Sequence, residues 1–230
     1  MLLFPISLGV SHLPDTEGLV SKPAAKLDKK KAEKTLHRDD FTCRFCGFRS
    51  EHYQRIIPWE EAGDPPFATA CGFCEQSFML DRTGLAGAAV LIWFPEVTQP
   101  ELNHIARAIY VARASKNTLS ASATRALDAL MARRSDAKKR IGSDDPLLLA
   151  TVIYESLSKE EYGTIGEKLD GIRLLPLEKH LVRTPRGEMN QFQQMVKFWC
   201  SPEGPYARLP AEQWADLFKA ATPAPAAGNA

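Results

Sequence analysis

The sequence predicts an α+β protein, in which a cysteine-containing module with strands is followed by a mainly helical portion. Two paired-cysteine motifs fall within residues 41–78, and the unbroken apolar run 88–94 predicts a strand that is buried on both faces. Helical periodicity dominates from residue 98 onward. The 230 residues, 44% apolar and 25% charged, are typical of a globular chain that can bury a core.

Changes in composition divide the chain into four parts. We expect an N-terminal strand and a basic linker or helix in residues 1–40, and the cysteine module with its buried strand in residues 41–97. The helical portion spans residues 98–221. Residues 222–230 are rich in Pro and Ala and too polar to pack, so they predict a flexible tail.

The beginning of the chain and its charge argue against several functions. Residues 1–8 are apolar but lack a basic n-region and are interrupted by Pro5, so we expect a strand and not a signal peptide. No apolar run approaches the roughly 18 residues of a membrane-spanning helix, which predicts a soluble protein. A net charge of +1 provides no broad basic field for nucleic acid.

Residues 21–40 are rich in lysine, with only sparse apolar positions, and they predict a short, solvated helix. The usual explanation of such a charge run is a water-exposed helical face. The run is also the only local support for nucleic-acid binding, through Lys22, Lys26, Lys29, Lys30, Lys31 and Lys34.

The helical portion begins with a clear signal. Thr98 and Glu101 form a capping-box signature with a proline in the first turn, which predicts a helix over residues 99–115. A second helix is predicted over residues 119–140, because it ends in basic residues before Gly142. Further helices are expected to open at residues 143–146 and 158–161 and to cover residues 188–199 and 210–220.

Four of the five cysteines form two Cys-x-x-Cys pairs. Cys43 and Cys46 make the first pair, Cys71 and Cys74 make the second, and 24 residues separate the pairs. Each pair offers two thiolates from a tight turn, and two pairs complete the tetrahedral set that a structural zinc ion requires. All four positions are then closed to a catalytic water, so we expect one Zn²⁺ that supports the fold.

Other uses of the cysteines fit the sequence less well. Disulfides require an oxidising compartment, for which a signal peptide is missing, and a thioredoxin-like redox motif normally has a single pair. The fifth cysteine, Cys200, follows Trp199 in an apolar setting, and we expect it to be a buried small hydrophobe.

Residues 38–48, 53–58 and 69–74 together resemble the zinc-supported form of the HNH nuclease fold. The resemblance implies a ββα module in which a strand lies between the two cysteine pairs. In that family the strand delivers an Asp-His pair just before an apolar doublet and a proline. The general base there activates water beside a separately bound catalytic metal.

The chain departs from the nuclease pattern at each catalytic place. Gln54 and Arg55 stand where the Asp-His pair is expected, Pro66 replaces the Asn before the second pair, and Glu75 stands where His or Asn is common. His52 lies three residues before the required position, and strand alternation would point it to the opposite face, so we expect a surface or turn residue. We therefore expect the fold without the catalysis, and not an enzyme.

A second resemblance takes in most of the chain. Residues 42–48, 53–54, 69–71, 94–103 and 172–176 are similar to the DotN/IcmJ family of the Dot/Icm (type IVB) secretion and related conjugation systems. The segment 95–103 is the most specific of these, because a generic HNH protein has no reason to carry it.

This resemblance implies a subunit of a type IV coupling complex. Members bind an extended C-terminal segment of a DotL-type coupling ATPase and help to assemble the platform that receives substrates. They lie at the cytoplasmic face of the inner membrane through their partners, and they have an HNH-like zinc fold without known nuclease function. Direct nucleic-acid binding is therefore not expected.

The resemblance does not identify the residues that would contact the partner. Trp59, Phe67 and Phe78 lie near the zinc module and could form an aromatic groove for a peptide, although a role in the core is the alternative for each. Two other functions also remain open: an HNH-type endonuclease with an atypical general base, and a zinc-ribbon protein that binds nucleic acid.

Overall fold

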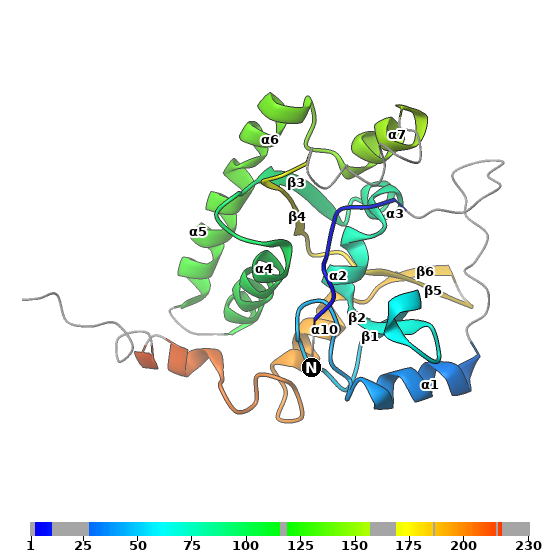
Figure 1. Ribbon diagram of the computed structural model, residues 1–230. Coiled ribbons are helices and arrows are strands. Elements are labelled where there is room, and N and C mark those ends of the chain that lie inside the picture. The colour runs from blue at the N-terminus through cyan, green and yellow to red at the C-terminus, as the bar shows by residue number, and fades with distance from the viewer. Residues whose placement is uncertain are drawn as a thin grey trace, which may run out of the picture.

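The computed structural model describes residues 3–10, 28–115, 119–156, 169–185, 187–214 and 216–217. Within these residues the fold combines helices with three two-stranded antiparallel sheets, which confirms the predicted α+β class (Figure 1). The first sheet and helix α2 (Gly72–Ser77) form the cysteine module, and helix α4 (Gln99–Ala114) packs against that module.

The cysteine module has the expected ββα order. Strand β1 (Gln54–Pro58) pairs with β2 (Phe67–Cys71) in a register that places Gln54 opposite Cys71. Helix α2 starts directly after Cys71, so the second cysteine pair joins the end of a strand to the first turn of a helix. The short 3-10 helix η1 (Glu60–Ala62) lies in the connection between the two strands.

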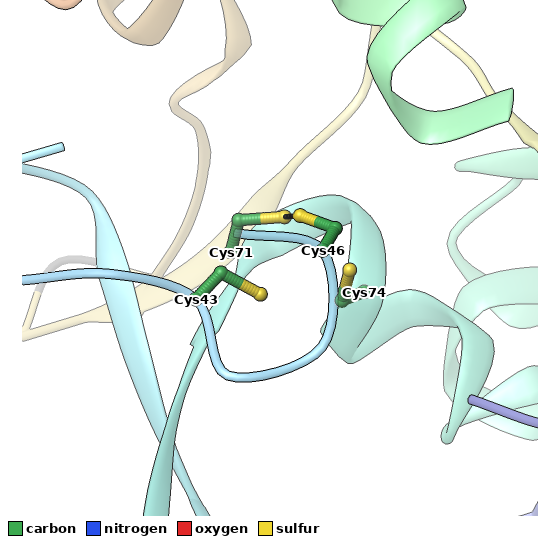
Figure 2. Close-up of side chains that lie close together, drawn as sticks. All are labelled: Cys43, Cys46, Cys71 and Cys74. Carbon is green, nitrogen blue, oxygen red and sulfur yellow. Dashed lines mark hydrogen bonds between the residues drawn. The ribbon is translucent and has the colours of Figure 1, made fainter. Parts of the chain in front are cut away.

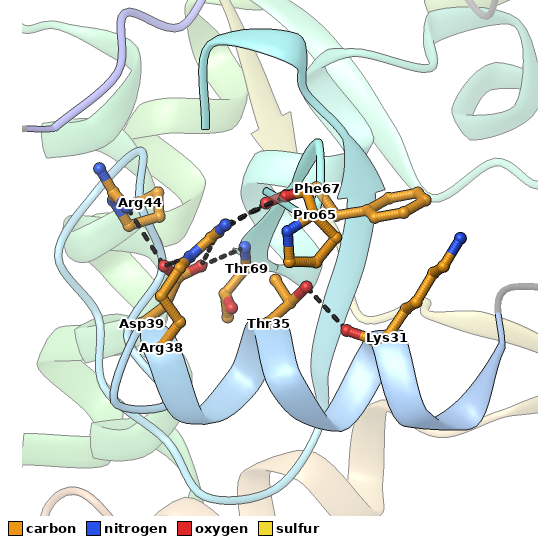
Figure 3. A network of polar contacts seen from close by, with 8 residues as sticks. All are labelled: Lys31, Thr35, Arg38, Asp39, Arg44, Pro65, Phe67 and Thr69. Carbon is orange, nitrogen blue, oxygen red and sulfur yellow. Dashed lines mark hydrogen bonds and ion pairs between the residues drawn. The ribbon is translucent and has the colours of Figure 1, made fainter. Parts of the chain in front are cut away.

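A buried carboxylate attaches the basic N-terminal helix to the module. Helix α1 (Lys29–Arg38) confirms the predicted basic helix, and Asp28 caps its start by accepting a hydrogen bond from the Lys30 N–H at 3.1 Å. The Asp39 side chain, 0% exposed, accepts hydrogen bonds from Arg38, from Arg44 and from the backbone N–H of Thr69 (Figure 3). Arg38 also donates to the carbonyl oxygens of Pro65 and Phe67.

The central ribbon joins distant parts of the chain. Strand β3 (Ala89–Trp93) pairs with β4 (Ile172–Pro176), so that Leu91 lies opposite Leu174. One face contributes Ile92 and Leu175 to the core around α4 and the module, and the other face packs on α3 (Leu80–Leu85), α6 (Arg134–Ile141) and α7 (Pro146–Ser156). The predicted burial of this strand on both faces is confirmed.

Helix α4 is fixed to this ribbon by polar bonds as well as by apolar packing. The capping box of Thr98 and Glu101 is present as predicted. The Gln99 side chain both accepts from and donates to the Leu174 backbone, at 2.8 Å each, and the Tyr110 hydroxyl donates to the Pro176 carbonyl oxygen at 2.7 Å.

The predicted helix over residues 119–140 is interrupted. Helix α5 (Leu119–Ala132) ends one residue before Arg133, and α6 begins one residue after it. The Arg133 carbonyl oxygen accepts a hydrogen bond from the Trp93 N–H, and its guanidinium pairs with Glu96 and lies 4.1 Å from the ring centroid of Phe94. These contacts hold Arg133 to the strand and break the helix there. Gly142 ends α6 in the left-handed conformation, as predicted.

Other local expectations are wrong. Residues 3–10 form no strand: Pro5 has no N–H to donate, and the segment is attached by bonds from the Phe4 N–H to Arg44 and from the Gly9 N–H to Ser77. The helix predicted over residues 188–199 starts only at residue 192, as α10 (Phe192–Trp199). Residues before it form the hairpin of β5 (Leu181–Thr184) and β6 (Gly187–Asn190).

Near the end of the chain, the structure shows the short 3-10 helix η2 (Ala211–Gln213) at the start of the predicted last helix. The helix expected at residues 158–161 and the tail 222–230 lie outside the described residues. Among the described segments, no helix is both long enough and apolar enough to cross a membrane.

Candidate metal centre

The two cysteine pairs converge on one point. The sulfur atoms of Cys43, Cys46, Cys71 and Cys74 all lie within 4.8 Å of one another, and all four residues are buried (Figure 2). The Cys46 and Cys71 sulfurs are 3.7 Å apart, and none of the four residues is in a disulfide. The arrangement can offer four sulfur ligands to a single ion.

The first pair is shaped by a tight turn. The Cys43 N–H donates to the Phe48 carbonyl oxygen, and the Gly47 N–H donates to the Cys43 carbonyl oxygen, each at 2.9 Å. Gly47 has a φ of 76°, a left-handed conformation that glycine adopts without steric cost. The Gln54 side chain closes the loop by donating to the carbonyl oxygens of Phe41 and Phe48.

Burial and mutual hydrogen bonding shift the pKa values of the clustered thiols in opposite directions. Burial raises the pKa of Cys43 well above the ordinary thiol value, and hydrogen bonding with Cys43 raises the pKa of Cys74. Hydrogen bonds from the neighbouring thiols instead hold the pKa of Cys46 far below that value. Four thiols this close cannot all ionise unless a cation joins them, so the cluster is suited to a metal ion.

Helix α4 contributes a second layer around the sulfurs. The Asn103 amide donates to the Cys74 sulfur at 3.3 Å, and the Arg107 guanidinium donates to the Cys71 sulfur at 3.2 Å. His104 lies between them in sequence, and its Nε2 is 2.6 Å from the Cys46 carbonyl oxygen. Since that oxygen can only accept, Nε2 carries the proton, and Nδ1 is free to accept from Arg107 at 3.3 Å.

Arg107 was not a candidate from the sequence. It is 0% exposed, and its guanidinium carbon lies 3.7 Å from the ring centroid of Phe48, with the rings of Phe73 and Trp199 at 5.3 and 5.7 Å. The sequence signal is the spacing of Gln99, Asn103 and Arg107, which places three polar residues on the face of α4 that also carries Leu102, Ala106 and Tyr110.

Gln54 and Arg55 stand where the resemblance to the HNH fold implies an Asp-His pair, and both side chains bind other residues of the module. Gln54 is engaged with the first cysteine loop, and the Arg55 Nε lies 3.2 Å from a Glu75 carboxylate oxygen. His52 is exposed before the strand, and its ring packs on Phe198 with centroids 4.7 Å apart, which confirms the expected surface position. Neither the Gln54 amide nor the Arg55 guanidinium has an ionisable group that could accept a proton as the histidine of that pair would.

A histidine from a distant part of the sequence lies near the Arg55–Glu75 pair. His180 is buried, and its ring lies against Gly72, where an added Cβ would meet it at 2.7 Å. Burial lowers the pKa of His180, and the charges of Glu75 and Arg55 also act on it. Sequence reasoning missed this neighbour because 104 residues separate Glu75 from His180.

Two of the three candidate aromatic contacts lie together. Trp59 and Phe78 are half-buried and join Phe4 and Phe45 in one aromatic cluster, with ring centroids 4.8 to 5.9 Å apart. Phe67, at the start of β2, is half-buried but does not belong to this cluster. The expectation for Cys200 is wrong, because that residue is exposed just after α10.

Comparison with known proteins adds one relative. No model of a known protein family matches the chain. The type 4 apparatus protein DotN of Legionella pneumophila subsp. pneumophila is 33% identical to it over 168 positions, and the match covers 66% of this chain and 76% of DotN. With this identity over three quarters of the relative, the chain belongs to the DotN/IcmJ family.

Proposed function

We propose that the chain is a non-catalytic subunit of a type IV coupling complex. It binds the C-terminal segment of a DotL-type coupling ATPase, and in this way it supports substrate recruitment for secretion or conjugation. Family membership supports this proposal, since the relative is named as a type 4 apparatus protein. The protein would act at the cytoplasmic face of the inner membrane, where its partners hold it.

One observation carries the non-catalytic part of the proposal. Gln54 and Arg55 occupy the positions of the nuclease acid-base pair, and each is held by partners within the module. A general base must reach a water molecule beside a metal, and an arginine paired with Glu75 cannot accept that proton. In this proposal the fold therefore serves to hold the protein together and to bind a partner, and not to catalyse a reaction.

The metal of the centre is Zn²⁺ in this proposal. Four buried cysteine sulfurs within 4.8 Å match the closed tetrahedral set of structural zinc sites. Such a set leaves no position for a catalytic water, and its role is to hold the two cysteine turns together. Element analysis of the purified protein should find one zinc ion per chain, and another metal or none would contradict this assignment.

The partner segment would dock beside the aromatic cluster of Phe4, Phe45, Trp59 and Phe78. Large aromatic side chains that are half-buried can anchor a peptide because they offer apolar area with little entropy to lose. Trp59 and Phe78 have this character, since each contacts the buried Phe45 ring at 4.8 to 4.9 Å and remains partly exposed.

The test is calorimetric titration of the full chain with the C-terminal segment of the coupling ATPase from the same organism. We expect binding, and we expect Trp59→Ala and Phe78→Ala to weaken it about tenfold or more, a loss of about 1.4 kcal/mol. Tyr53→Ala is the matched control, because Tyr53 is also half-buried but packs on Phe198, outside the cluster.

The outcomes test the proposed partner and the proposed docking surface separately. A wild-type chain that does not bind the segment contradicts the proposed partner. Binding that is unchanged in both aromatic variants rejects the aromatic surface but keeps the partner. Phe67→Ala, measured in the same series, decides whether the start of β2 contributes to this surface.

A further inference from the structure

Arg107 carries a buried positive charge that lies against the sulfur cluster. Its side chain is fully buried in the middle of α4, and the groups that act on its charge are Cys71, Cys46, Tyr206 and Cys74. Its guanidinium donates to the Cys71 sulfur and to His104 Nδ1, and neither of these partners is a carboxylate. Burying an unpaired guanidinium costs several kcal/mol, so this charge needs an anionic partner inside the protein.

The sulfur cluster can be that partner. Four thiolates around a divalent ion keep a net negative charge, which is itself unfavourable in an apolar interior. The Arg107 Nη2 donates to the Cys71 sulfur at 3.2 Å, while the ring of Phe48 covers the guanidinium at 3.7 Å and excludes water. Each buried charge thus offsets the desolvation cost of the other.

A second donor on the same helix reinforces the contact. Asn103 lies one turn before Arg107, so both side chains leave α4 on one face, and the Asn103 amide reaches the Cys74 sulfur at 3.3 Å. The two side chains therefore donate hydrogen bonds to the two cysteines of the second pair, Cys71 and Cys74. Outer-layer donors of this kind orient metal ligands and influence how tightly the metal is held.

We propose that Arg107 is the resident counter-cation of the four-sulfur metal centre, so that metal retention and the docking of α4 on the module stabilise each other. The coupling is reciprocal by thermodynamic necessity: whatever α4 contributes to metal binding, the metal contributes to the attachment of α4. The metal centre then connects the module to the helical portion as well as holding two turns. This inference rests on the proposed metal content of the centre.

The test measures metal release in Arg107→Met and Arg107→Lys. Zinc transfer from the purified, zinc-loaded chain to a chromophoric chelator is followed at fixed pH. We expect release from the Met variant to be about 10- to 100-fold faster than from wild type, with the Lys variant between them, because lysine keeps the charge without the planar fork. Arg113→Met is the matched control, since Arg113 lies on the same helix but pairs with Glu178.

A spectroscopic measurement distinguishes a bond to sulfur from simple packing. In the Co²⁺-loaded protein, loss of an N–H donor to a ligating sulfur should shift the sulfur-to-cobalt charge-transfer band to lower energy. We expect this shift in Arg107→Met and in Asn103→Leu, a smaller shift in Arg107→Lys, because its ammonium can still donate to sulfur, and none in Arg113→Met. If Arg107→Met does not fold, the Lys and Leu variants still decide the question.

The coupling itself is tested by hydrogen exchange with and without zinc. Removing zinc should reduce protection throughout α4, not only in the cysteine turns. Release rates and cobalt spectra that equal those of the control, or an α4 that keeps its protection without zinc, would overturn the inference. A wild-type protein without zinc would instead contradict the proposed metal content, and failure to bind the ATPase segment would contradict the proposed partner, so the failures are distinguishable.

Discussion

The β1–β2–α2 module carries two polar centres that differ in burial and in partners. The four-sulfur centre is buried and is contacted by α4, whereas the Arg55–Glu75 pair at the nuclease position has side chains that are 41% and 16% exposed. The four sulfurs of the first centre can hold a structural metal ion, whereas at the second place Arg55, paired with Glu75, stands where the resemblance to the HNH nuclease fold implies an acid-base pair. The comparison shows that one module can carry a metal-binding cluster beside a position at which the side chains form an ion pair.

The largest effect should come from the sulfur centre. We expect Cys71→Ser to lose the metal and to unfold the module, because structural zinc can contribute about 10 kcal/mol or more of apparent folding free energy. Metal content and thermal unfolding of the variant check this prediction. Cys200→Ser is the control, since that exposed cysteine is not part of the cluster, and its melting temperature should match wild type.

An intermediate effect should come from Asp39, which fixes α1 and the first cysteine loop. Removing its charge weakens the contacts that Arg38 and Arg44 make with it, and we expect Asp39→Asn to lower the free energy of unfolding by about 3 kcal/mol. Urea denaturation measures the loss. Asp40→Asn is the matched control, because Asp40 is exposed and pairs with Arg49 on the surface, so it should change stability little.

The Asp39 effect should depend on pH. Burial works to raise the pKa of Asp39, but hydrogen bonds from Arg38, Thr69 and Arg44 outweigh it and hold the pKa below the ordinary value. A lowered folded-state pKa means that the carboxylate stabilises the protein above the unfolded pKa, and that this stability is lost as pH falls through the folded pKa. The difference between wild type and Asp39→Asn should therefore shrink below about pH 4. A difference that does not change with pH would contradict the assignment.

The smallest effect should come from the nuclease position. We expect Arg55→Ala to cost about 0.5 kcal/mol, because a half-exposed ion pair contributes little. Neither this variant nor wild type should nick supercoiled DNA in the presence of divalent metals. Metal-dependent nicking that disappears in His180→Ala would contradict the proposal that this position is non-catalytic. It would establish an enzyme with an atypical base.

Local signals predicted the features that depend on local sequence. The cysteine spacing predicted that Cys43, Cys46, Cys71 and Cys74 would come together, and the Thr98–Glu101 capping box predicted the start of α4. The apolar run 88–94 predicted β3 because a strand buried on both faces needs no alternation.

The features that the sequence did not predict either lack a local pattern or depend on distant contacts. The β5–β6 hairpin is short, and its second strand is exposed at every residue, so no alternating pattern marks it. Arg107 stands in an ordinary helical pattern, and only the tertiary fold brings it to the sulfurs. The break at Arg133 likewise comes from its contacts with the β3 region and not from a helix-breaking residue.

The pairing of β3 with β4 has a consequence for synthesis on the ribosome. Trp93 pairs with Ile172, so a nascent chain emerges with β3 complete while its partner is still untranslated. At about 5–20 residues per second, the apolar edge of β3 waits roughly 4–16 s for that partner. During this interval helices α4 to α6 can form, but the ribbon cannot close, and a chaperone or a slow codon in this stretch would act on an exposed strand.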